Sequence, residues 1–202
     1  MLAESTNFLV RRAKCAAWAV GIGASIAFAG AGQAVAEQCA NGPDKVWLNE
    51  PTDPPASDEK AITKLISLYH WALDDQRMSD LPDLFVDDVK FELCNAAGDR
   101  LAFKASKTDL LTYIQAYIIS AIQKGKPQTR HTASNTLLNA KDADTIEGKT
   151  TIVVTLQHSD IETPVLDYTG ALRTVFKRDG DAWKFAEITL ITDGPRLELR
   201  AR

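Results

Sequence analysis

The residues best suited to chemistry in this sequence lie in one stretch, residues 128–138, which begins polar and ends apolar. The pattern predicts a β-strand, in which successive side chains alternate between the two faces. One face would carry His131, Ala133, Asn135 and Leu137. A titratable imidazole and an amide on the same face, above an apolar floor, suit the wall of a pocket that holds a small molecule.

Two long helices are predicted before this strand. Ser57 is a good N-cap for the first helix, which carries an apolar stripe and ends near Gln76. Ser106 opens the second helix as the N-cap of a capping box, and Gly125 and Pro127 end it. Between them we expect a short helix over 80–85, a strand over 89–94 and a short strand or irregular return over 101–103.

The second half of the chain is strand-like. The expected strands are 128–138, 150–158, 166–177 and 182–191, with a hairpin turn at Asp179-Gly180 between the last two. Helices that come first and antiparallel strands that come later predict an α+β fold, with the helices packed on one face of the sheet. A strongly curved sheet closed by those helices would form a cone around an internal pocket.

The N-terminal segment has the pattern of a signal peptide. Basic residues at 11, 12 and 14 precede an Ala/Gly-rich apolar run that closes with Ala34-Val35-Ala36. We therefore expect residues 1–36 to be removed and the mature protein to be exported, either periplasmic or secreted, with no membrane attachment. An uncleaved membrane anchor is the alternative, because the apolar run is nearly long enough to span a bilayer.

The mature chain divides into three parts. Residues 37–56 are proline-rich and predict a strap or linker, residues 57–193 form the domain, and residues 194–202 form a charged tail. Cys39 and Cys94 would remain after cleavage, in an oxidising compartment. They are candidates for one disulfide, and the alternative is two separate thiols.

Composition excludes several classes of function. The net charge of −4 offers no basic stripe for nucleic acid. The three histidines, His70, His131 and His158, do not have the spacing of metal ligands, and we expect no metal. There is no Gly-rich phosphate loop and no serine nucleophile elbow, so we expect no cofactor.

Four segments together resemble the SnoaL-like domains. Residues 69–74 and 84–91 are similar to the first helix and first strand of that family. Residues 130–135 resemble its Arg-His strand, and residues 178–185 resemble its closing turn. The family shares the fold of ketosteroid isomerase, scytalone dehydratase and nuclear transport factor two. The resemblance over roughly 57–193 therefore implies a cystatin-like α+β barrel, mixed but mostly antiparallel, with an internal pocket.

The resemblance also implies a set of roles. The sequence is similar to the bile-acid dehydratases and scytalone dehydratase, and this resemblance places Tyr69, Asp74 and His131 at catalytic positions. His131 would be the general base, Asp74 would accept from His131 and fix its tautomer or relay the proton, and Tyr69 would donate to a substrate oxygen. Asn135 would orient the ligand, because the strand pattern predicts it on the face of His131. His158, at a strand end, is a candidate for the position of a second histidine found in scytalone dehydratase.

Some alternatives stay open at this point. Asp74 lies about 140° around an ideal helix from Tyr69 and need not face a pocket, so Asp75 is an equal candidate. His70 is expected to point outward. The functions that fit are a cofactor-free dehydratase or isomerase for a small hydrophobic carbonyl compound, a non-catalytic binding domain for a hydrophobic small molecule, and a dimeric assembly module. We also expect a homodimer.

Overall fold

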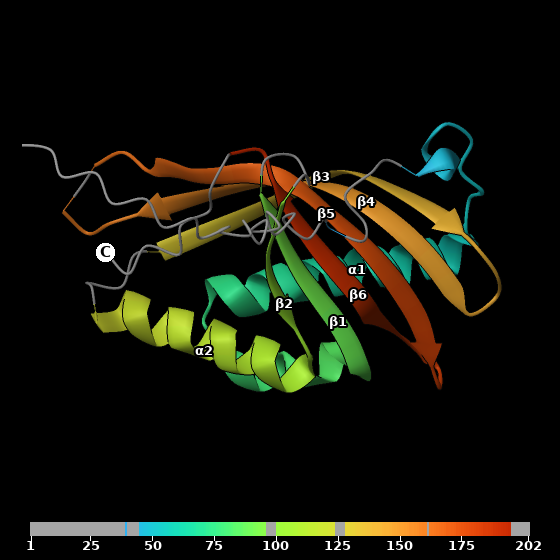
Figure 1. Ribbon diagram of the computed structural model, residues 1–202, viewed down its shortest axis with the longest axis horizontal. Helices are drawn as coiled ribbons and strands as arrows, with labels where there is room; N and C mark the ends of the chain where they lie inside the picture. Colours follow the sequence, from blue (N-terminus) through green and yellow to red (C-terminus); the bar gives the residue numbers. More distant parts are fainter. Residues whose placement is uncertain (1–38, 40–44, 96–99, 124–127, 161, 195–202) are drawn as a thin grey trace, which may run out of the picture. The chain divides into compact units, whose positions relative to one another are not determined.

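The computed structural model describes residue 39 and residues 45–95, 100–123, 128–160 and 162–194 (Figure 1). All of these residues belong to one compact unit, residues 35–202. The expected signal peptide, residues 1–36, lies outside the described residues, as does the charged tail beyond Gly194. Within the described ranges, no helix is both long and apolar enough to cross a membrane.

Six strands form one curved sheet (Figure 1). They are β1 Phe85–Asn95, β2 Arg100–Ala105, β3 Gln128–Ala140, β4 Thr145–Gln157, β5 Val165–Asp179 and β6 Ala182–Thr192. Their order is β2-β1-β6-β5-β4-β3; β1 and β6 are parallel, and the other neighbours are antiparallel. The α+β prediction is confirmed. The sheet is open rather than closed into a barrel, because β2 and β3 are edges that do not pair with each other.

Two helices, α1 Ala56–Asp74 and α2 Lys107–Gln123, lie on the same face of this sheet (Figure 1). We call this the inner face. Helix α1 packs against β3 and β6, and α2 packs against β1 and β2. The helix expected over 80–85 is instead two 3-10 turns, η2 Met78–Asp80 and η3 Pro82–Leu84. Pro82 has no N–H to donate, which favours a short turn over a continuous helix.

Helix α1 starts differently from the sequence prediction. Pro55, not Ser57, is its N-cap residue, and no side chain caps it. The carbonyl of Pro55 accepts the first backbone N–H groups of the helix, including that of Asp58 at 2.9 Å. The Asp58 carboxylate accepts from Trp183 at 3.1 Å and from Arg178 at 3.0 Å. These bonds tie the first turn of α1 to the β5–β6 hairpin and fix the helix over the sheet.

The core fills the space between the helices and the inner face. Its largest fully buried side chains include Phe85, Phe176 and Phe185. The ring of Tyr69, from α1, lies 6.0 Å from that of Phe85 and 5.4 Å from that of Phe185. Burying aromatic rings of this size contributes much of the stability of a small domain. It also holds the C-terminal half of α1 in a fixed position.

The chain before α1 is attached to the sheet at two points. Cys39 and Cys94 form a disulfide with a Cα–Cα distance of 6.2 Å, which is one of the two states that the sequence left open. Thr52 exchanges hydrogen bonds with the end of β3: its carbonyl accepts from the Ala140 N–H at 2.8 Å, and its N–H donates to the Asn139 side chain at 2.9 Å. The strap is thus joined to β1 and to the edge strand β3.

Candidate active site

Asp74 and His131 come together at the end of α1. The Nδ1 atom of His131 lies 2.6 Å from Oδ1 of Asp74, and the His131 backbone N–H donates to Oδ2 at 2.9 Å. The side chain of His131 is 12% exposed, and that of Asp74 is 5% exposed. The carboxylate therefore binds both the ring and the backbone of the same residue, which fixes the orientation of the imidazole.

The local structure explains why these two residues meet. Strand β3 is a sheet edge, so the outward N–H groups of its backbone are not used by a neighbouring strand. Asp74, the last residue of α1, accepts one of them. It also accepts from the Thr129 hydroxyl at 2.9 Å, and Gln128 donates to its backbone carbonyl at 2.9 Å. The first residues of β3 thus anchor the C-terminus of α1.

The charge of Asp74 determines the tautomer of His131. Burial acts to raise the pKa of Asp74, but the hydrogen bonds from His131, the charge of His131 and the bond from Thr129 outweigh it and lower the pKa overall. The carboxylate is therefore ionised at neutral pH and can only accept hydrogen bonds. Nδ1 of His131 must then carry a proton, which leaves Nε2 of the neutral ring as the basic atom.

Asp75, the alternative carboxylate, does not fill this position. Its side chain is 45% exposed and lies 3.8 Å from Arg77. Asp74 is instead buried because α1 contacts two surfaces: Tyr69 faces the core, and Asp74 faces the edge strand. The buried arc of the helix is wide enough to include both, although they are about 140° apart on an ideal helix.

The prediction that His70 points outward is wrong. This residue is 5% exposed, and its ring stacks on that of His131 with centroids 5.6 Å apart and planes within 5°. Ile66, His70 and Asp74 are spaced four apart and are all buried. That helical spacing was the signal that could have identified His70.

The chain's four tyrosines, Tyr69, Tyr113, Tyr117 and Tyr168, influence one another's pKa, and Tyr69 lies beside His70. The ring of Tyr69 lies 5.3 Å from that of His70, and burial, then the charge of Tyr113, raises the pKa of Tyr69. Tyr168 lies in β5, and its pKa is raised by burial and then by Tyr69 and Tyr117. In the described part of the chain, no side chain or backbone group hydrogen-bonds any of these four hydroxyls. The phenols are therefore neutral donors at physiological pH.

The register places one of these phenols on the face of His131. His131 pairs with Val154 of β4, and Val154 pairs with Tyr168 of β5. Residues directly opposite each other in a sheet point to the same side. His131 and Tyr168 are therefore both on the inner face, on either side of Val154.

Asn135 does not continue the face of His131 as the sequence pattern predicted that it would. It has a φ of 50°, is exposed, and lies at a bulge where the register shifts between Ser134 and Leu137. One extra residue reverses the alternation, so Leu138 rather than Leu137 returns to the face of His131. The expectation of a continuous face from His131 to Leu137 is therefore wrong beyond Ser134, and ligand binding by Asn135 stays a prediction.

No metal centre is found among the described residues, where no three His, Cys, Asp or Glu side chains could hold an ion. His158 follows the last residue of β4, at the strand end that pairs with Gln128. Its role as a second catalytic histidine stays a prediction.

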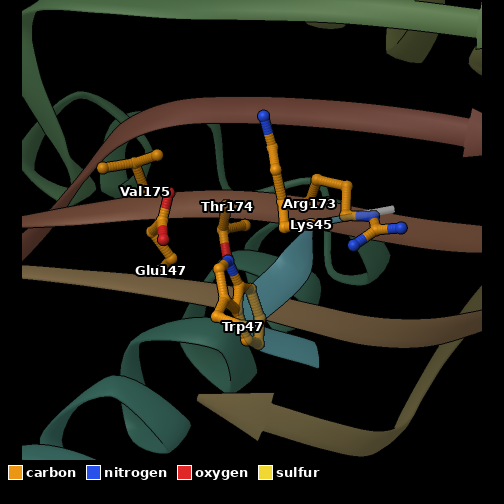
Figure 2. A pocket seen from close by; sticks show the side chains of 7 residues that line it. Lys45, Trp47, Glu147, Arg173, Thr174 and Val175 are labelled. Atoms are coloured by element: carbon orange, nitrogen blue, oxygen red, sulfur yellow. The ribbon is translucent and has the colours of Figure 1, made fainter. Parts of the chain in front are cut away.

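A small cavity lies beneath the strap, where Lys45 and Trp47 face Arg173 and Thr174 of β5 (Figure 2). Its volume is about 20 Å³. That is room for roughly one water molecule, and too little for a substrate. Neither Asp74 nor His131 lines this strap cavity, so it is separate from the candidate active site.

His70 should make the stability of the protein depend on pH. Burial, then the charge of His131, lowers its pKa to about 4, and Asp74 offsets this only in part. Between about pH 6.5 and 4 the unfolded chain binds a proton that the folded chain does not, so stability falls as the pH falls, by an amount on the order of 3 kcal/mol. Urea unfolding at pH 7, 5.5 and 4 should show this loss, and His70→Phe should remove most of it. Equal pH dependence in the two proteins would contradict the assignment.

Comparison with solved structures identifies the fold. A protein assigned as the β subunit of an aromatic-ring-hydroxylating dioxygenase from Novosphingobium aromaticivorans is 21% identical, with a TM-score of 0.59 over 72% of this chain and 95% of that one. A protein assigned as a scytalone dehydratase from the same organism is 19% identical, with a TM-score of 0.54 over 67% and 84%. A cystatin-like protein of unknown function from Nostoc punctiforme is 16% identical, with a TM-score of 0.54 over 70% and 96%. At these identities the likeness shows a shared fold.

Among curated proteins, none matches this chain. The family model of the SnoaL-like domain matches residues 54–189, which include α1, the whole of β3 and the Asp74–His131 pair. The resemblance inferred from the sequence is thereby confirmed: the chain belongs to the SnoaL-like domain family.

Proposed function

We propose that this protein is a cofactor-independent dehydratase or isomerase that acts on a small hydrophobic carbonyl compound. The observation that carries the proposal is the Asp74–His131 pair. A buried carboxylate holds Nδ1 of the imidazole at 2.6 Å, and no described residue hydrogen-bonds Nε2. An imidazole ordered in this way is suited to serve as a general base.

The chemistry needs no external oxidant or reductant. Nε2 of His131 takes the proton from a carbon next to the substrate carbonyl, and the C–H electron pair forms an enolate. In a dehydration, the enolate expels the hydroxyl group of the next carbon, and the proton held by His131 leaves with it as water. In an isomerisation, the same proton returns to a different carbon. The charge of Asp74 stabilises the imidazolium between these steps.

The phenols offer a partner for the enolate oxygen. Tyr69 is 6% exposed, and its raised pKa keeps it protonated. Its hydroxyl makes no hydrogen bond to a described residue and is not among the fully buried unpaired atoms, so it is available to donate. Donation from a tyrosine hydroxyl to the developing negative charge would lower the barrier of the proton transfer.

The other two functions fit the structure less well. A pure binding domain would have an apolar lining, whereas here the Asp74 carboxylate holds the His131 imidazole, and the ring of Tyr69 lies 5.3 Å from that of His70. An assembly module would use a flat apolar outer face. On that face Glu147 and Lys149 of β4 pair in register with Val175 and Arg173 of β5. Lys90 and Glu187 form an ion pair at 3.3 Å on β1 and β6. Export and a homodimer remain predictions.

A turnover assay tests the proposal. Cyclic β-hydroxy ketones, including 3-hydroxycyclohexanone, are offered to the wild type and to His131→Gln, and the ultraviolet absorbance of the enone is followed. We expect turnover by the wild type and a rate lower by about a hundredfold or more in His131→Gln, which lacks the base. Asp75→Asn, which changes a half-exposed carboxylate next to the site, is the matched control and should retain activity. If the ketones raise the Tm of the wild type and none is converted, the protein is a binding domain.

A further inference from the structure

His70 is a mostly buried side chain whose ring nitrogens make no hydrogen bond to the residues that the structure describes. It is 5% exposed. A neutral imidazole carries one N–H donor and one acceptor nitrogen. Neither ring nitrogen is among the described side-chain atoms that are fully buried and unpaired, so the part of the ring that stays accessible includes them. A molecule at the site can therefore reach a donor and an acceptor of His70 that no described residue uses.

The position of His70 indicates where that partner binds. Its ring lies 5.6 Å from that of His131 and nearly parallel to it. Two parallel rings at this distance present their edges side by side. A molecule as large as a six-membered ring that contacts the edge of His131 is therefore within reach of the edge of His70 as well.

The charges around His70 determine the kind of atom it can bind. Burial, then the charge of His131, lowers its pKa to about 4, so the ring is uncharged at neutral pH. Asp74 on α1 is negative, and Tyr69 and Tyr168 are neutral. Arg130 lies over the ring of Trp71, a half-exposed residue on the outside of α1, with 5.9 Å between its guanidinium carbon and the ring centre. Such surroundings favour a neutral oxygen over a carboxylate or a phosphate.

We propose that His70 is a second ligand-contacting residue of this site, which hydrogen-bonds an uncharged carbonyl or hydroxyl oxygen while His131 acts on the neighbouring carbon. The inference rests on the proposed function, since it assumes that the ligand enters at His131. The competing explanation is packing alone, and in that case a phenylalanine would serve equally well at this position.

His70→Phe separates the two explanations, because it keeps an aromatic ring in the stack and removes both nitrogens. If His70 binds the ligand, the Tm of His70→Phe at pH 7 equals or exceeds that of the wild type. Its kcat/KM for 3-hydroxycyclohexanone then falls about tenfold, the effect of losing one hydrogen bond. A His70→Phe variant that folds and keeps its kcat/KM within twofold of the wild type overturns the inference and leaves the proposed function intact.

A binding measurement keeps the inference testable even if the protein has no turnover. In wild-type protein labelled with ¹⁵N-histidine, addition of cyclohex-2-enone should shift the ring signals of His70, assigned by their loss in His70→Phe. Cyclohexanecarboxylate, a negatively charged compound of similar size, should shift them much less. His70 signals that neither the enone nor 3-hydroxycyclohexanone moves would overturn the inference, and so would an equal response to the carboxylate.

Discussion

Replacing Asp74 by asparagine is expected to lower kcat/KM for a β-hydroxy ketone by about a hundredfold to ten-thousandfold. The amide has nearly the shape of the carboxylate, but it carries no charge to stabilise the His131 imidazolium. It also presents an NH₂ group to a site where Thr129 and two N–H groups of His131 donate. The preference for the Nδ1-protonated tautomer is thereby lost. Steady-state kinetics at pH 7 measure the effect directly.

Asp75→Asn is the matched control for this variant. Asp75 is the next residue in the chain, and it is half-exposed beside Arg77. Its substitution should leave kcat/KM within about twofold of the wild type, since surface changes of this kind have small effects. Equal losses in the two variants would mean that the carboxylate at His131 has no special role in the reaction.

Loss of the Cys39–Cys94 disulfide is expected to lower the free energy of unfolding by about 4 kcal/mol. The bond joins residues that are 55 positions apart, so reduction frees a long loop in the unfolded chain. For a domain of this size the Tm should fall by roughly 10 °C. The measurement is thermal unfolding of the oxidised protein with and without a phosphine reductant.

The double variant Cys39→Ser, Cys94→Ser provides the control for the reductant. Its Tm should match that of the reduced protein and should not respond to the phosphine. The bonds between Thr52 and the end of β3 would remain, so the strap would stay attached at that point. A Tm that is the same before and after complete reduction would show that the disulfide does not stabilise the domain.

The helices and strands follow from local sequence patterns, and the sequence predicts them well. Apolar spacing identifies both long helices, and alternation with turn residues identifies the antiparallel order of β3 to β6. Two features of the fold have no such local signal. The pairing of β1 beside β6 in parallel joins segments that are far apart in the chain. The second feature is that the sheet stays open, because whether the edge strands β2 and β3 pair with each other depends on the whole fold.

The site was only partly predictable for a related reason. The sequence identifies His131 and a carboxylate at the end of the first helix, but choosing Asp74 over Asp75 requires knowing that α1 touches the edge of the sheet as well as the core. His70 was missed because a single narrow apolar stripe was assumed. The bulge at Asn135 has only a weak signal, since asparagine tolerates a positive φ but does not require it.

The most direct test of the account is hydrogen exchange at the carbon next to a carbonyl. Cyclohexanone is incubated with the protein in D₂O, and deuterium at the α-carbon is followed by NMR. If Nε2 of His131 removes that proton, the wild type accelerates exchange, and Asp74→Asn and His131→Gln both lose the acceleration. Exchange that is no faster with the wild type than in buffer, or equally fast with His131→Gln, would contradict the assignment of His131 as the base.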